Sequence, residues 1–311
     1  MDLGRDQPNW EPSIQRFLDF VRRNCELEVV QPRDTAEGIA EETRPFMPKQ
    51  VIEKYFTDNR FREFKETYSA LFPSSHDHCD PRRVLNKYTA VFCTLLQAGR
   101  GPYIKHFLQH HSLSDTALPF SLENPPANLP ITPGDPNFLS DICNQQWRFC
   151  APVFDSILNT NFESERVLPI TSKTRLAGGG TAALWLIKLR DGYNNLSKAP
   201  RNTSNLFVLK EYSTNDAQKY YDNETAAFDK IKAHPHIIGY YGCFRRGGTF
   251  NVLLEYADKG TLKQFFERQA PPLGYPGLIN FWKGQFNLID ALRAIHEVTP
   301  FSGDGPRIFQ G

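Results

Sequence analysis

Hydrophobic residues in the first 120 positions recur at intervals of three and four, which is the spacing of one face of an α-helix. Stripes of this kind cover residues 14–21, 51–71, 84–96 and 103–108. Gly99 can end the third stripe, because glycine adopts the left-handed conformation that commonly closes a helix. The pattern predicts an all-helical region over residues 1–120.

Proline interrupts the helical pattern in the next segment. Five prolines between Ser121 and Asn137 exclude a helix or a central strand there, because proline lacks the amide hydrogen that either structure needs. Apolar and aromatic residues over 143–158 then predict a short helix whose side chains pack as core. We therefore interpret residues 121–166 as a proline-rich linker followed by a short helix.

From Val167 onward the hydrophobic period changes from helical to strand-like. Strand-like runs cover residues 184–189, 207–212, 237–244 and 249–254, and two glycines can turn the chain between the last two. Helical stripes occur at residues 221–231 and 278–295. The chain is therefore predicted to be α+β, with helices first and a sheet with packed helices after them.

Composition limits the classes of partner and compartment. Of 311 residues, 40% are hydrophobic, and 36 basic against 35 acidic residues leave a net charge of +1. Such a balance gives no electrostatic basis for binding nucleic acid or an anionic membrane. Six cysteines without a Cys-x-x-Cys pair are typical of reduced, intracellular thiols, and no secretory leader or apolar run of spanning length is present. An intracellular protein, cytoplasmic or nuclear, is expected.

A metal site is not expected. His76, His78 and Cys79 lie close together in the sequence, but no second ligand cluster accompanies them at a suitable spacing. We interpret that segment as a polar loop.

Candidate chemistry begins with three consecutive glycines and a lysine. Gly178, Gly179 and Gly180 stand between strand-like runs, where backbone amides can lie close over a phosphate. Lys210 lies within the strand-like run 207–212, so a rigid sheet would hold its ammonium group. The simpler alternative is an edge-strand lysine that discourages aggregation.

Glu224 falls on the apolar stripe of the helix that follows Lys210. A carboxylate buried there without a partner would cost several kcal/mol, and Lys210 is the nearest candidate cation on a facing strand. A glutamate turned toward solvent is the alternative.

The order of these features strongly resembles the N-lobe of eukaryotic protein kinases of the serine/threonine type. The glycine loop, the strand lysine and the helix glutamate are followed by His-Pro-His-Ile-Ile at 234–238 and Leu-Glu-Tyr-Ala-Asp-Lys-Gly-Thr-Leu at 254–262. The resemblance implies a five-stranded antiparallel N-lobe sheet with a helix C, followed by the first helices of the C-lobe. The preceding helical region is similar to that of fungal kinase-like proteins.

The resemblance also implies residue roles. Lys210 matches the lysine that binds the α- and β-phosphates of ATP, and Glu224 matches its helix-C partner. Leu254 stands at the gatekeeper position, Glu255 and Ala257 offer backbone groups to adenine, and Val208 replaces the usual alanine of the adenine roof. The glycine loop departs from the family, with alanines at both outer glycine positions, so phosphate closure is expected to be poorer.

The His-Arg-Asp and Asp-Phe-Gly motifs do not occur in the 311 residues. The catalytic base and the residues that would hold the metal of Mg-ATP therefore have no counterpart in this chain. The sequence predicts an ATP-binding, serine/threonine kinase-like domain over 167–311 that is truncated before the catalytic loop and inactive alone. The alternatives are a pseudokinase-like regulator or scaffold whose helical region binds a protein partner, and a fragment that barely folds.

Overall fold

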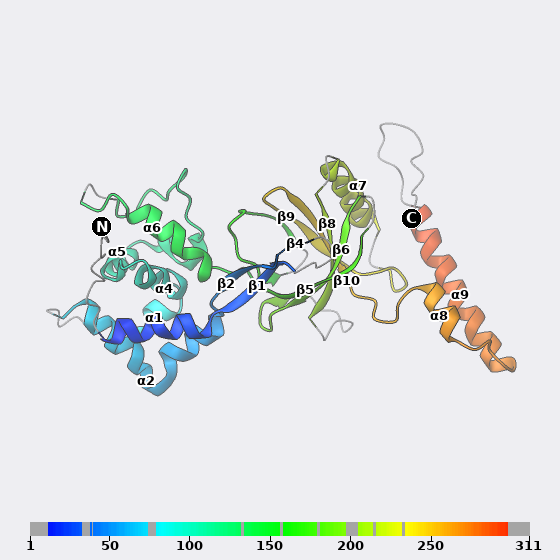
Figure 1. The fold of residues 1–311 in the computed structure, drawn as a ribbon, viewed down its shortest axis with the longest axis horizontal. Coiled ribbons are helices and arrows are strands. Elements are labelled where there is room, and N and C mark those ends of the chain that lie inside the picture. The colour runs from blue at the N-terminus through cyan, green and yellow to red at the C-terminus, as the bar shows by residue number, and fades with distance from the viewer. Residues whose placement is uncertain are drawn as a thin grey trace. The chain divides into compact units, whose positions relative to one another are not determined.

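The computed structural model describes residues 12–32, 38, 40–73, 79–131, 134–155, 158–178, 181–196, 205–213, 216–231 and 234–297. They form two compact units that interleave along the chain (Figure 1). Unit 1 comprises Met1–Val153, Glu165–Ser172 and Arg190–Tyr193, and unit 2 comprises Phe154–Ser164, Lys173–Leu189 and Asn194–Gly311. The predicted α+β class is confirmed, and the division of the chain at residues 121 and 167 stays a prediction.

Unit 1 is mostly helical, as the stripes predicted. Its helices are α1 (Pro12–Asn24), α2 (Lys49–Leu71), α3 (Pro81–Leu85), α4 (Thr89–Gln97), α5 (Ile104–Phe107) and α6 (Phe138–Gln145), with 3₁₀ turns η1 (Gly101–Tyr103), η2 (His111–Leu113), η3 (Asp115–Ala117) and η4 (Gln146–Arg148). Non-helical dihedrals from Asp58 to Phe61 divide α2 into two segments. The prediction of a helix over 143–158 was wrong beyond Arg148, where η4 ends, because Pro152 disfavours continuing the helix and strand β3 (Phe154–Asp155) follows.

A β-hairpin shows that the prediction of an all-helical region was wrong. Strands β1 (Glu26–Gln31) and β2 (Glu42–Phe46) pair antiparallel within unit 1. Two adjacent valines favour the extended backbone of β1, and Pro45 in β2 removes an amide that a helix would need. The hairpin lacked a clear alternation because its buried residue in β1 is Glu28, which is 0% exposed.

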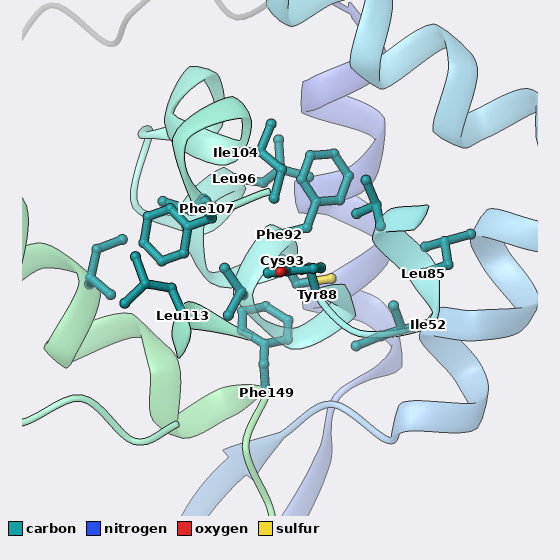
Figure 2. Close-up of a cluster of buried hydrophobic side chains, with 14 of the residues drawn as sticks. Ile52, Leu85, Tyr88, Phe92, Cys93, Leu96, Ile104, Phe107, Leu113 and Phe149 are labelled. Carbon is teal, nitrogen blue, oxygen red and sulfur yellow. The ribbon is translucent and has the colours of Figure 1, made fainter. Parts of the chain in front are cut away.

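The core of unit 1 surrounds α4, which is buried on nearly every side. Figure 2 shows labelled side chains from α2, α3, α5 and η2 gathered around Phe92, Cys93 and Leu96 of α4. The hydroxyls of Thr89 and Thr94 donate to carbonyls one turn earlier, at 2.7 and 2.8 Å, which satisfies these two buried hydroxyls of α4. A helix that is apolar all round belongs in a core.

Two short segments from the second half of the chain belong to unit 1. The Leu168 amide donates to the buried Glu28 carboxylate at 3.0 Å, and Arg190 pairs with Glu26 at 3.1 Å. The Tyr193 hydroxyl accepts a hydrogen bond of 2.8 Å from the first amide of α2. A protein cut between residues 153 and 167 would therefore lose contacts that help to hold unit 1 together.

Unit 2 is built on a six-stranded sheet with the order β4-β9-β10-β8-β6-β5. Its strands are β4 (Leu158–Phe162), β5 (Ile170–Gly178, whose first residues belong to unit 1), β6 (Ala183–Leu189), β8 (Leu206–Tyr212), β9 (Tyr240–Arg246) and β10 (Thr249–Glu255). Strand β10 pairs antiparallel with β8 and β9, and β6 pairs antiparallel with β8. Two-residue strands β3 (Phe154–Asp155) and β7 (Asn194–Asn195) form a separate parallel pair.

The prediction of five antiparallel strands was wrong by one strand, because β4 pairs parallel with β9 at the sheet edge. The β4 sequence Leu-Asn-Thr-Asn-Phe has little hydrophobic alternation, so its period gave no strand. Gly242 of β9 permits this pairing: its φ is +117°, and a Cβ there would collide with the Leu158 backbone.

Helix α7 (Ala217–Lys230) packs on this sheet against β8, β9 and β10 (Figure 1). The residues buried at this contact form one cluster, here called the α7 cluster: Tyr212, Ala217, Tyr221, Cys243, Val252 and Leu254. Val208, Phe228 and Tyr240 are partly buried against it. The cluster fixes which face of the sheet the helix covers.

Two helices follow the sheet, α8 (Leu262–Arg268) and α9 (Tyr275–His296). The hydroxyl of Thr261 and the side chain of Gln264 form a capping box at the start of α8. The predicted stripe of α9 is present, and its exposed side chains include Tyr275, Leu278, Trp282, Phe286, Ile289 and Leu292. Within the described ranges, no helix has both the length and the hydropathy needed to cross a bilayer.

Candidate nucleotide site

Lys210 lies on β8, an inner strand of the sheet, with β6 on one side and β10 on the other. Its direct neighbours across the strands are Leu184 and Val252. The edge-strand alternative is therefore wrong. Because side chains alternate along a strand, Val208, Lys210 and Tyr212 share one face, and it is the face that α7 covers.

Lys210 and Glu224 form an ion pair, as the sequence predicted. The Lys210 Nζ atom lies 2.6 Å from Oε2 of Glu224, which projects from α7 about two turns after the helix begins. The two side chains are 28% and 20% exposed, so the pair is shielded but open to solvent on one side. The alternative of a glutamate turned toward solvent is wrong.

Tyr212 is a member of this site that the sequence did not reveal. Its hydroxyl donates to the same Oε2 atom of Glu224 that Lys210 contacts. Burial and the neighbouring Glu224 carboxylate both raise the pKa of Tyr212, so the phenol stays protonated and able to donate. The sequence indicated only that Tyr212 follows Lys210 by two residues on a strand, so that the two side chains point to the same face.

An apolar wall borders the lysine on the same face of the sheet. Val208 on β8 lies directly opposite Leu254 on β10, and Leu254 belongs to the buried α7 cluster. Ala182, which follows the glycine run, also packs against this cluster. A ligand at Lys210 could therefore meet a charged group and an apolar surface together, as many small-molecule sites require.

The last residue of β10, Glu255, is fixed to Gly239, the residue just before β9. The Glu255 amide donates to the Gly239 carbonyl at 2.8 Å, and the Gly239 amide donates to the Glu255 carboxylate at 2.9 Å. A ligand near Glu255 would therefore have to use its carbonyl oxygen. Ala257 is exposed, and its carbonyl accepts a bond of 3.5 Å from the Gly260 amide.

The glycine loop is only partly described. Gly178 ends β5, whereas Gly179 and Gly180 lie outside the described residues. The phosphate contacts expected of these glycines stay predictions.

A second lysine–glutamate pair lies on the opposite face of the same sheet. Lys173 of β5 contacts Glu211 of β8 at 3.1 Å and lies 4.7 Å from the ring centroid of Trp185 on β6. The Lys173 side chain is only 6% exposed. A buried ammonium enclosed in this way supports the sheet but offers little to a ligand.

Potential metal ligands do not gather in the described part of the chain, where no group of three or more histidine, cysteine, aspartate or glutamate residues could hold an ion. His76 and His78 lie outside that part. All six cysteines are described, and each is a free thiol.

In a comparison with known protein families, residues 180–298 match the family of protein tyrosine and serine/threonine kinases. A stretch of 97 residues, 31% of this chain, is 28% identical to the mouse serine/threonine-protein kinase Nek5 and covers 15% of that protein. The predicted resemblance to protein kinases is confirmed for this region. It includes Lys210, Glu224 and the segment at Leu254–Ala257, whereas the fungal likeness and the truncation stay predictions.

Proposed function

We propose that residues 167–311 form a serine/threonine kinase-like domain that binds ATP at Lys210. The observation that carries the proposal is the 2.6 Å contact between Lys210 and Glu224, because it lies within the region that matches protein kinases. In this proposal Lys210 binds the α- and β-phosphates, and Glu224 holds the lysine side chain toward them.

The charge and shape of the site support this assignment. The Lys210 side chain is 28% exposed, so anionic oxygens can reach its ammonium group while Glu224 keeps it oriented. Val208 and Leu254 would line the adenine ring, with the backbone at Glu255 and Ala257 at its edge. Glycine amides at 178–180 would lie over the phosphates, with looser closure because alanines replace the outer glycines.

The proposed activity of these 311 residues is nucleotide binding without phosphoryl transfer. The sequence contains no His-Arg-Asp or Asp-Phe-Gly, so it supplies neither the base nor the ligands for the magnesium that accompanies ATP. When bound, magnesium would neutralise phosphate charge. The six free thiols support a reducing, intracellular setting.

The test is a thermal-shift titration with ATP on the whole 311-residue protein. Ligand at 100 times its Kd stabilises a fold by about 2.7 kcal/mol, which gives a clear rise in Tm. Lys210→Met should remove this rise. Lys173→Met is the matched control, because it removes a lysine of the opposite face that also pairs with glutamate. It should lower the starting Tm but keep the rise; an equal rise in Lys210→Met would refute the ATP site.

A second candidate is a non-catalytic regulator or scaffold. The observation that favours it is the core of unit 1, which encloses α4 and is not part of the region that matches protein kinases. Such a unit can bind a protein partner whether or not unit 2 binds nucleotide. A folded protein whose Tm does not respond to ATP, with or without magnesium, would favour this candidate.

A further inference from the structure

The carboxylate of Glu224 receives two hydrogen bonds from one strand. Lys210 and Tyr212 are two residues apart on β8, a separation of about 6.6 Å along the strand. Both donate to Oε2 of Glu224, one from an ammonium group and the other from a neutral hydroxyl. The helix is therefore joined to the sheet by two bonds of different character.

We infer that Tyr212 is a positioning residue, which holds Glu224 and thereby helix α7 on β8 independently of Lys210. The inference rests on the proposed nucleotide site for its consequence, but the hydrogen bond itself does not need a ligand.

The two donors should respond differently to a bound polyphosphate. An ammonium group has three donors, and a phosphate would draw some of them away from Glu224. A neutral phenol has one donor and no net charge to attract the phosphate. With Tyr212 present, Glu224 keeps one bond to the sheet while Lys210 turns toward the nucleotide.

The surroundings of Tyr212 suit it to this role. The side chain is 1% exposed and belongs to the α7 cluster, so its hydroxyl has little freedom to find another acceptor. Its ring centroid lies 5.4 Å from Nζ of Lys210, which places the aromatic ring beside the ammonium as well. Because the raised pKa keeps the phenol protonated, the bond persists across the neutral range.

A simpler explanation is that Tyr212 is a core aromatic residue whose hydroxyl merely needs an acceptor. The two explanations predict that removing the hydroxyl destabilises different parts of the unit. If Tyr212 positions Glu224, its loss should loosen α7 in particular, and the effect should depend on Glu224. If the role is only packing, the loss should be small, or spread over the unit and independent of Glu224.

Hydrogen–deuterium exchange on the full protein without nucleotide separates these cases. In Tyr212→Phe, amides of α7 should exchange about tenfold faster, equivalent to about 1.4 kcal/mol, while β9 and β10 change little. Tyr240→Phe is the matched control, because Tyr240 stacks on Phe228 of α7 at 4.8 Å and does not contact Glu224 in any described bond. It should leave α7 exchange within about twofold of the parent protein.

A double-mutant cycle completes the test. In a Glu224→Ala background, Tyr212→Phe should add little to α7 exchange, because the acceptor is already gone. Additive effects of the two substitutions, or unchanged exchange in Tyr212→Phe, would overturn the inference. If Tyr212→Phe does not fold, the bond is tested from the Glu224 side. In a Lys210→Met background, Glu224→Ala should still speed α7 exchange, because Tyr212 donates to Glu224 without Lys210, and unchanged exchange there would overturn the inference.

A nucleotide measurement shows which proposal has failed. Where the parent protein shows an ATP-dependent rise in Tm, that rise should be smaller in Tyr212→Phe and unchanged in Tyr240→Phe. Absence of the rise in the parent protein would count against the ATP site alone, because the exchange measurement needs no ligand.

Discussion

Two lysine–glutamate pairs on opposite faces of one sheet show how burial separates a site from a structural contact. Lys210 and Glu224 join a strand to a helix and are 28% and 20% exposed. Lys173 and Glu211 join two strands across Trp185, and the lysine is 6% exposed. The chemistry of the two pairs is the same, but only the first lysine can be reached by a ligand while its carboxylate holds it.

The largest expected difference between the pairs is in stability. Glu211→Gln removes the carboxylate that contacts the buried Lys173 ammonium at 3.1 Å and should lower the free energy of unfolding by about 3 kcal/mol. Glu224→Gln should cost only about 1 kcal/mol, because water can hydrate Lys210 and the amide oxygen can still accept from Tyr212. Urea denaturation measures both. If Glu224→Gln lowered the free energy of unfolding more than Glu211→Gln, the pair of Lys210 and Glu224 would be the structural one.

The sequence allowed the first pair to be predicted but not the second. A glutamate on an apolar helical stripe requires a partner, and a lysine in a preceding strand supplies one by a local argument. The contact between Lys173 and Glu211 spans an intervening strand, so it depends on the strand order of the whole sheet. The hydrophobic period of a single strand does not show the order of strands in the sheet. Lys173 lies 38 residues before Glu211, so no local pattern in the sequence connects them.

The same limit explains two of the errors in the predicted fold. Strand β4 is polar, and it pairs with β9 only because Gly242 lets the two backbones approach closely. The β1–β2 hairpin buries Glu28, which reverses the hydrophobic alternation that would have identified a strand. In both places a contact distant in sequence overrides the local pattern.

The two pairs have different aromatic neighbours, and only the neighbour of Lys210, Tyr212, should make stability depend on alkaline pH. The pKa of Tyr212 is raised above its ordinary value of 10.0, so its contribution to stability is complete below pH 10 and is lost as pH rises above it. Between pH 10 and the raised pKa of the folded protein, one such group lowers the free energy of unfolding by about 1.4 kcal/mol per pH unit. Tyr212→Phe should therefore have a shallower alkaline decline.

Trp185, the neighbour of Lys173, has no proton to lose in this range, so Trp185→Phe should keep the parent slope. Denaturation at pH 9, 10 and 11 gives the three slopes. Equal slopes in Tyr212→Phe and the parent protein would mean that folding does not raise the pKa of Tyr212.

The smallest expected difference is in the response to salt. Screening weakens an ion pair that solvent reaches, and the Debye length falls from about 10 Å at 0.1 M to about 3 Å at 1 M. The coupling energy between Lys210 and Glu224, from a cycle of Lys210→Met and Glu224→Gln, should therefore fall from about 1 kcal/mol to a few tenths over that range.

The equivalent cycle of Lys173→Met and Glu211→Gln should change little with salt, because a side chain that is 6% exposed leaves little room for counterions. If both couplings fell equally, solvent would reach the two lysines alike, and the difference in access that singles out Lys210 as the ligand-binding lysine would be lost. If only the first fell, the salt dependence would show that an anion can approach Lys210 while Glu224 remains in place, which is what a phosphate site requires.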